Sequence, residues 1–261
     1  MTLTNFFTNA LTLSKKFASI PQDVMLPSIA LLLDASDTSK FNWVSTDRTV
    51  TSWTTSDTSA VVFSSIQANT IVRQPKKHWK NNHVVCIPPN SNMGLQSTAF
   101  LINSLFGANG KDQTVFIVTQ ADDPLKTFQT IYYQYVSAAN GHYFRVSQTA
   151  SNFRWLAVSS TNFIAGSNST LVARPVIITL QRQADVVRGW VNGQKFGSDV
   201  ASASTAATAT SQVMFLGTSS VSGGGTQADL AEIRIYKDVV SDSDRIKIED
   251  YLAYKWIEGI Q

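Results

Sequence analysis

The stretch Gln227–Tyr236, QADLAEIRIY, decides the fold of this chain, together with Ser241–Trp256, SDSDRIKIEDYLAYKW, which follows after a short turn. From Leu230 to Tyr236, apolar and polar residues mostly alternate. Because successive side chains of a strand point to opposite faces, this alternation predicts a strand with one buried face.

The second of these segments has the features of a capped amphipathic helix. Ser241 is a suitable N-cap, and Asp244 lies three residues further on, where the first turn favours negative charge. Ile248, Leu252 and Trp256 follow one another at intervals of four residues and form one apolar stripe. The sequence therefore predicts a last strand that leads into a docked terminal helix.

Together these segments resemble the C-terminal signature of laminin-G-like, concanavalin A-like jelly-roll domains. Upstream stretches resemble further elements of that family in the same order, and the resemblance covers roughly residues 28 to 258. These stretches are Leu32–Asp37, Val50–Trp53, Thr114–Val118, Gly189–Gly193 and Phe215–Gly217. The resemblance implies an all-β chain: a concanavalin A-like jelly-roll β-sandwich over residues 28–261, with a short C-terminal helix and an N-terminal arm over residues 1–27.

The pattern of the remaining chain agrees with an all-β sandwich, because short strand-like runs recur between turn signals. Asn140-Gly141 and Asn192-Gly193 are hairpin signals, and Gln183-Ala184 is expected to close a third hairpin. The strands are expected at 29–34, 60–66, 84–87, 98–102, 114–120, 128–136, 143–148, 153–159, 175–182, 185–191, 212–217 and 228–236.

The predicted arm is partly helical in its apolar period, and its apolar positions include Phe6, Phe7, Leu11 and Phe17. Two interpretations stay open. The arm either docks on a partner or on a neighbouring subunit of a homo-oligomer, or it covers one end of its own sandwich.

Composition limits the classes of partner. The net charge is +3 and charged residues make up 15% of the chain, which gives little support for nucleic-acid binding. The longest apolar run, Ile29–Leu33, is far too short to span a bilayer, and no signal peptide is evident. We therefore expect a protein made in the cytoplasm without membrane insertion.

Hydrolysis of glycans needs two carboxylates that flank the scissile bond. Glu232 lies on the predicted last strand without a second acid at 234 or 236, and Glu249 and Glu258 belong to the terminal helix or its end. Asp122-Asp123 precedes a proline and indicates a turn. The sequence thus predicts a protein that is not an enzyme.

No cofactor is expected. The family's usual acidic stretch is replaced by Val85–Asn92, which lacks an acidic pair, so the motif does not support a calcium site. Asp34 and Asp37 are expected to lie in a turn and to bond to the backbone. The three histidines lack the spacing of a zinc site, so no metal ligands are assigned.

Aromatic residues are the remaining candidates for ligand binding, because sugar faces stack on aromatic rings that carry a polar tip. Trp79, in a basic loop, is expected to be exposed, and Tyr133, Tyr135, His142 and Tyr143 crowd one predicted hairpin. Alternation places positions 133 and 135 on the opposite face from 132. The competing interpretation is that these rings form part of the core.

The family resemblance implies a virion structural and adhesion protein, such as a phage capsid-decoration, head-fibre or tail-associated protein. Such a protein is made in the host cytoplasm and exposed on the particle, where it contacts capsid or other virion proteins and cell-surface glycans. The alternative is a stand-alone carbohydrate-binding lectin module, and a glycoside hydrolase is the least favoured interpretation.

Overall fold

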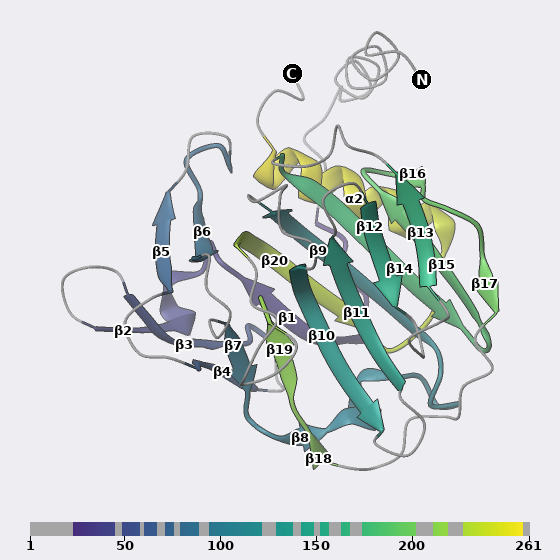
Figure 1. Cartoon of the computed structure of the whole chain (residues 1–261), viewed down its shortest axis with the longest axis horizontal. Helices are drawn as coiled ribbons and strands as arrows, with labels where there is room; N and C mark the ends of the chain where they lie inside the picture. The colour runs from purple at the N-terminus through teal and green to yellow at the C-terminus, as the bar shows by residue number, and fades with distance from the viewer. Residues whose placement is uncertain are drawn as a thin grey trace, which may run out of the picture.

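The computed structural model describes residues 23–44, 49–57, 60–66, 71–75, 79–88, 94–121, 129–137, 142–148, 152–156, 163–167, 174–201, 211–218 and 227–257. Within these ranges the chain is built almost entirely of antiparallel strands, with one α-helix at the C-terminal end (Figure 1). This arrangement confirms the predicted all-β sandwich with a C-terminal helix. Among the described residues, no helix is both long and apolar enough to cross a membrane.

The strands of the sandwich follow the chain in two long series. The first series is β1 (Ile29–Asp34), β2 (Phe41–Val44), β3 (Thr49–Thr54), β4 (Val62–Ser65), β5 (Val72–Pro75), β6 (His83–Ile87), β7 (Leu95–Ser97), β8 (Phe100–Leu101), β9 (Gln113–Ala121) and β10 (Gln129–Ser137). The second is β11 (His142–Gln148), β12 (Asn152–Leu156), β13 (Phe163–Ser167), β14 (Val176–Gln183), β15 (Val186–Val191), β16 (Gln194–Lys195), β17 (Val200–Ala201), β18 (Ser211–Gln212), β19 (Met214–Leu216) and β20 (Ala228–Tyr236). Two 3-10 helices, Thr38–Lys40 and Ile102–Leu105, lie between strands.

The strands form two layers. In the first, β20 pairs with β9 along one edge and with β1 and β6 along the other, and β9 continues through β14 to β15. In the second, the order is β4, β7, β19, β10, β11, β12 and β13. Strands β5 and β3 connect β6 of the first layer to β4 of the second. In Figure 1 the strands β10 and β11 pass in front of β1 and β20.

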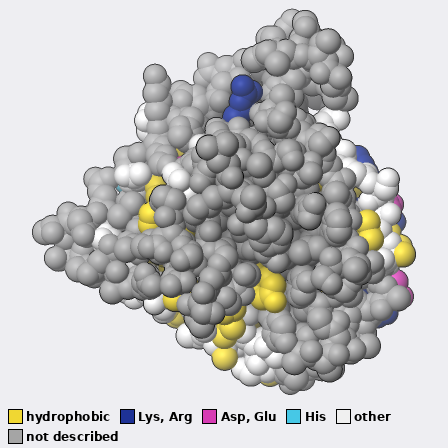
Figure 2. All heavy atoms as spheres, in the orientation of Figure 1, with side chains coloured by type: hydrophobic (Ala, Val, Ile, Leu, Met, Phe, Trp, Pro, Cys, Tyr) yellow, Lys and Arg dark blue, Asp and Glu magenta, His cyan; other side chains and the backbone are white. Residues whose placement is uncertain are grey.

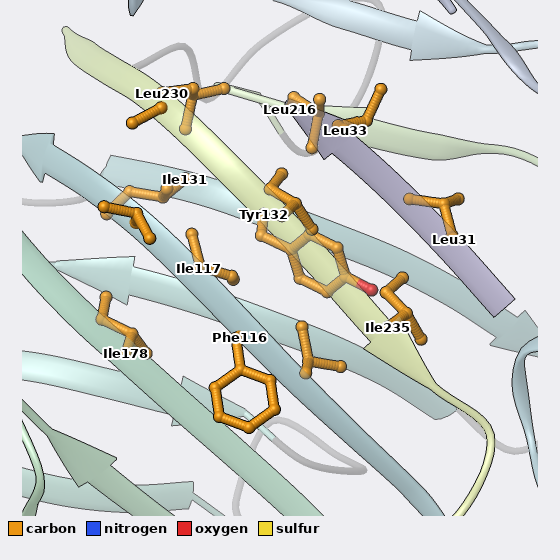
Figure 3. Packing of buried hydrophobic residues seen from close by; sticks show 14 of the residues in the cluster. Leu31, Leu33, Phe116, Ile117, Ile131, Tyr132, Ile178, Leu216, Leu230 and Ile235 are labelled. Carbon is orange, nitrogen blue, oxygen red and sulfur yellow. The ribbon is translucent and has the colours of Figure 1, made fainter. Parts of the chain in front are cut away.

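Apolar side chains from the facing sides of both layers fill the interior (Figure 3). Ile117 pairs with Ile178 across β9 and β14, and Leu31 pairs with Ile235 across β1 and β20. Tyr132 from β10 closes the interior from the second layer, and all five side chains are buried. Burial of such side chains contributes about 1.5–3 kcal/mol each, which makes this interior the main source of stability.

Helix α2 (Asp242–Trp256) covers the outer face of the first layer, as the sequence predicts. The Ser241 side chain caps it by accepting a hydrogen bond from the backbone N–H of Asp244, with an Oγ–N distance of 3.2 Å. The stripe of Ile248, Leu252 and Trp256 is fully buried against the sheet. The terminal signature therefore forms one strand–helix unit that is stapled to the middle of the fold.

Two of the predicted hairpins are visible in full. Asn192 and Gly193 both have positive φ angles, 49° and 75°, as a two-residue turn between β15 and β16 requires. The loop between β14 and β15 is formed by Ala184 and Asp185, one residue later than predicted, because Gln183 still pairs with Val186. At the third site β10 and β11 pair as expected, while the turn itself lies outside the described residues.

The described end of the predicted arm lies against the sandwich. Asp23 forms an ion pair with Arg234, and the hydroxyl of Tyr236 donates to the carbonyl of Val24 over 3.4 Å. Val24 and Leu26 also pack on the hydrophobic core. Phe6, Phe7, Leu11 and Phe17 lie outside the described residues.

Candidate functional site

A buried group of charges joins β20 to α2, and Glu232 is at its centre. The Glu232 carboxylate accepts hydrogen bonds from the Lys255 ammonium and from the Trp256 indole N–H, each at 2.7 Å, and from the Arg234 guanidinium at 2.5 Å. Glu232 and Arg234 are each about 1% exposed. Because a buried charge is costly unless it is paired and hydrogen-bonded, these contacts hold the charges in place.

Two further carboxylates complete this charge group. Asp34 accepts a second hydrogen bond from Lys255 at 2.6 Å, and Asp23 forms a two-pronged contact with Arg234 at 2.5 and 3.0 Å. Burial lowers the pKa of Lys255, but the nearby Glu232 and Asp34 carboxylates outweigh it and hold that pKa above its usual value. Lys255 is therefore a fixed cation that binds the helix to β1 and β20.

Trp79 is fully buried, so the expectation that it is exposed for sugar stacking is wrong. Its indole N–H donates to the Asp229 carboxylate at 3.2 Å, and its ring meets that of Trp256 edge-on with centroids 6.3 Å apart. The next residues of this loop, Lys80 and Asn82, donate to backbone carbonyls in the last turn of α2. The loop holds the helix end, where carbonyls lack partners within the helix, and this requires Trp79 to turn inward.

Glu249 on α2 is likewise held within the fold. It accepts hydrogen bonds from the Thr179 hydroxyl and from Arg245, the latter at 2.7 Å, and burial raises its pKa. The Arg245 guanidinium lies 4.4 Å from the ring centroid of Trp190. Glu232 and Glu249, two of the carboxylates considered for hydrolysis, are thus both engaged in ion pairs beneath the surface.

Asp34 and Asp37 lie in the turn after β1, as expected. One Asp34 oxygen accepts hydrogen bonds from the backbone and hydroxyl of Ser36, and Asp37 accepts those of Ser39. Within the described ranges, no three His, Cys, Asp or Glu side chains gather where they could hold a metal ion.

The outer face of β10 carries the first of the predicted ligand residues. Tyr132 and Gln134 are buried, with the Tyr132 hydroxyl donating to the Gln134 side chain at 2.6 Å. Tyr133, between them, is half-buried, and its ring centroid is 6.2 Å from that of Phe215 on β19. Because side chains alternate along a strand, Tyr133 lies on the face opposite the core.

The backbone register assigns more aromatic positions to this outer face. Tyr133 pairs with Arg145 across β10 and β11, and Tyr135 pairs with Tyr143. Directly paired residues share a face of the sheet, so these four positions lie together on the solvent side. His142 pairs with Ser137 at the end of the same ladder, and for Tyr135, His142 and Tyr143 the side chains lie outside what the structure describes.

Sequence reasoning missed three positions on this face: Arg145, Arg154 and Phe215. Arg154 on β12 pairs with Ser147, and Ser147 lies two residues from Arg145 on β11. Their grouping depends on register between strands, which one strand's pattern does not show. A signal was nevertheless present, because β10 to β13 contain two arginines and no Asp or Glu. In Figure 2, which shows this side of the molecule, the visible described acidic side chains lie at one margin.

No protein-family model matches this chain. No curated protein sequence matches it either. Solved structures do share its fold. The binding domain of botulinum neurotoxin serotype D has a TM-score of 0.58 and 8% identity, over 87% of this chain and 51% of the toxin domain.

Two other solved structures are similar over most of this chain. Domain 4 of the arabinanase AbnA from Geobacillus stearothermophilus, solved with arabinotriose, has a TM-score of 0.56 and 13% identity over 85% of this chain and 98% of that domain. Trypanosoma rangeli sialidase, solved with sialic acid, has a TM-score of 0.61 and 11% identity over 94% of this chain and 38% of the enzyme. At these identities the comparisons establish the β-sandwich fold alone.

Proposed function

We propose that this chain is a non-enzymatic glycan-binding domain, with its ligand on the outer face of β10 and β11. The observation that carries the proposal is Tyr133, which is half-buried beside Phe215 on the face opposite the core. Positions 135 and 143 extend the aromatic row along the same face. Two solved structures with a similar fold contain arabinotriose or sialic acid, which favours a sugar as the ligand.

The physical basis is stacking between a sugar face and an aromatic ring. An aromatic side chain offers a large apolar area, and the hydroxyl of tyrosine can also hydrogen-bond to the ligand. Tyr133 lies in the middle of a ladder and packs against Phe215, so its ring loses little freedom when a ligand binds. A site on paired strands is also more rigid than one on a loop.

The engagement of both glutamates argues for binding without hydrolysis. A glycosidase needs a carboxylic acid and a second carboxylate on opposite sides of the bond. Glu232 is tied to three donors, and Glu249 to Thr179 and Arg245, and both lie on the helix side of the first layer. We therefore propose that no cofactor and no catalytic pair is needed.

A glycan array with the full chain tests this function. Reproducible binding to one class of glycan is expected, with loss of about tenfold in affinity in Tyr133→Ala, because one stacked aromatic ring contributes about 1–2 kcal/mol. Tyr254→Ala is the matched control, since Tyr254 is an exposed tyrosine on α2. Folded protein that binds no glycan, or equal effects of both substitutions, would overturn the proposal. Repeating the array in EDTA tests the expectation that no calcium is required.

We further propose that the domain acts as an adhesion component of a virus particle, as the sequence's resemblance to phage virion proteins suggests. In this role residues 1–22 attach the domain to capsid or other virion proteins, or to further copies of the chain, after synthesis in the host cytoplasm. The alternative is an independent lectin module. Glycan binding on the outer face is common to both.

Deletion of residues 1–22 distinguishes these two roles. The cut leaves Asp23 in place, because Asp23 pairs with the buried Arg234 and its loss affects the folded domain itself. A particle-adhesion role predicts that the shortened chain no longer joins particles and still binds glycans. Unchanged incorporation into particles would contradict the attachment role of this segment.

A further inference from the structure

The outer face of β10 to β12 carries two arginine positions beside its aromatic row. Arg145 pairs with Tyr133 on one side and with Leu156 on the other. Arg154 is two residues before Leu156 on β12 and pairs with Ser147. The two arginines are therefore diagonal neighbours on one face of adjacent strands, at a typical spacing of about 7–8 Å.

The charge of these strands is of one sign. Strands β10 to β13 contain Arg145, Arg154 and His142, and their sequences include no Asp or Glu. The situation differs on the helix side, where Arg234, Lys255 and Arg245 each form ion pairs with acids from neighbouring elements. A cationic face built without acidic residues of its own is complementary to an anionic ligand.

We infer that the glycan recognised on this face is anionic, with a carboxylate or sulfate group at the Arg145 and Arg154 positions and a sugar ring at the Tyr133 position. This inference rests on the proposed glycan-binding function and specifies its ligand. A guanidinium group suits either anion, because its planar fork of donors can form two parallel hydrogen bonds to one acidic group. The aromatic row then selects a sugar, and the arginines select its charge.

Binding of four defined probes to the full chain tests the inference, measured by calorimetry. The probes are sialyllactose, a heparin-derived oligosaccharide, neutral lactose and arabinotriose. At least one anionic probe is expected to bind about tenfold or more tightly than the neutral ones, and its affinity should fall as salt concentration rises. The anionic probe that binds identifies the source of the acidic group.

The double variant Arg145→Gln and Arg154→Gln is expected to lose about 10- to 100-fold in affinity for the anionic probe and little for a neutral sugar. Arg188→Gln is the matched control, because Arg188 is a partly exposed arginine on β15 that pairs with Asp199. If the double variant melts at a lower temperature, Arg145→Lys and Arg154→Lys provide a second test that keeps the charge and removes the fork. These single variants should weaken the anionic probe with an unchanged melting temperature.

The outcomes separate this inference from the function beneath it. Neutral sugars that bind as well as the anionic ones, with no salt dependence, would overturn the inference and leave the glycan-binding function standing. An anionic probe that binds equally well to the chain and to the double arginine variant would also overturn it. Failure of all glycans, anionic and neutral, to bind folded protein would remove the proposed function itself.

Discussion

The two sides of the sandwich use charged and aromatic residues in opposite ways. Beneath α2, Glu232, Arg234 and Lys255 are buried and paired, and Trp79 meets Trp256 inside the fold. On the outer face of the other layer, Tyr133 is half-buried on the side away from the core, in a strand that contains no acid. The same residue types thus serve stability on one side and are available for binding on the other, and the partners around them make the difference.

The largest effect is expected from the side that holds the helix. Glu232→Ala removes the shared acceptor of Arg234, Lys255 and Trp256, and leaves two buried cations with fewer partners. Breaking a buried ion pair in this way costs about 3–5 kcal/mol in the free energy of unfolding. Urea denaturation at neutral pH measures this loss.

Asp199→Ala is the control for this prediction, because Asp199 pairs with Arg188 and Lys195 at the surface. It should lower the free energy of unfolding by a small fraction of the Glu232 effect, since exposed ion pairs contribute little. Glu232→Gln, which keeps the shape of the side chain, provides a measurable variant if the alanine form does not fold. Equal losses from Asp199→Ala and the Glu232 variants would contradict the structural role given to the buried group.

A smaller effect is expected beside the proposed ligand face, at Gly217 directly after β19. Its φ angle is +75°, and a Cβ atom there would lie 2.3 Å from Cδ1 of Ile87. Gly217→Ala should therefore cost about 2–3 kcal/mol through a strained backbone and a packed neighbour that must shift. The measurement is again urea denaturation.

Gly193 is the matched position, because it has the same φ of +75° and its nearest atom would be 3.6 Å away, in the Glu249 carboxylate. Gly193→Ala should cost only about 1–2 kcal/mol, the contribution of the left-handed backbone alone. The difference between the two alanine variants isolates the steric part. Identical losses would show that contact with Ile87 contributes nothing.

The sequence predicts the helix side well, because its signals are local. The cap at Ser241, the buried stripe that ends at Trp256 and the strand over 228–236 all depend on residues close together in the chain, and each is confirmed. The hairpin at Asn192 and Gly193 is of the same kind, since its positive φ angles are a property of those two residues. Local chemistry of this type can be seen in one sequence.

Long-range packing explains what could not be predicted. Trp79 stands in a polar, basic loop, and only the arrival of Trp256, 177 positions later, makes it a core residue (256 − 79). The proximity of Arg145 and Arg154 depends on a register between strands. For Tyr133 the alternation of the strand predicted the correct face relative to Tyr132, whereas its neighbour Phe215 comes from a distant strand.

The last prediction concerns pH and the helix side alone. Burial raises the pKa of Glu249 above its ordinary value, although Thr179 and Arg245 both oppose this shift. The folded chain therefore binds this proton more tightly than the unfolded chain does. Its contribution to stability is complete below the ordinary pKa of about 4.3 and is lost as pH rises through the raised folded value.

Glu249→Gln removes this dependence, so the free energy of unfolding of the native chain, relative to that variant, should fall as pH rises through the raised pKa. Thr179→Val sharpens the test, because it removes a hydrogen bond that lowers this pKa and should move the loss to higher pH. A difference that grows with rising pH would mean that Arg245 outweighs burial. Anion binding on the outer face should be unaffected by Glu249→Gln at any pH where the variant is folded, because the two sides are chemically separate.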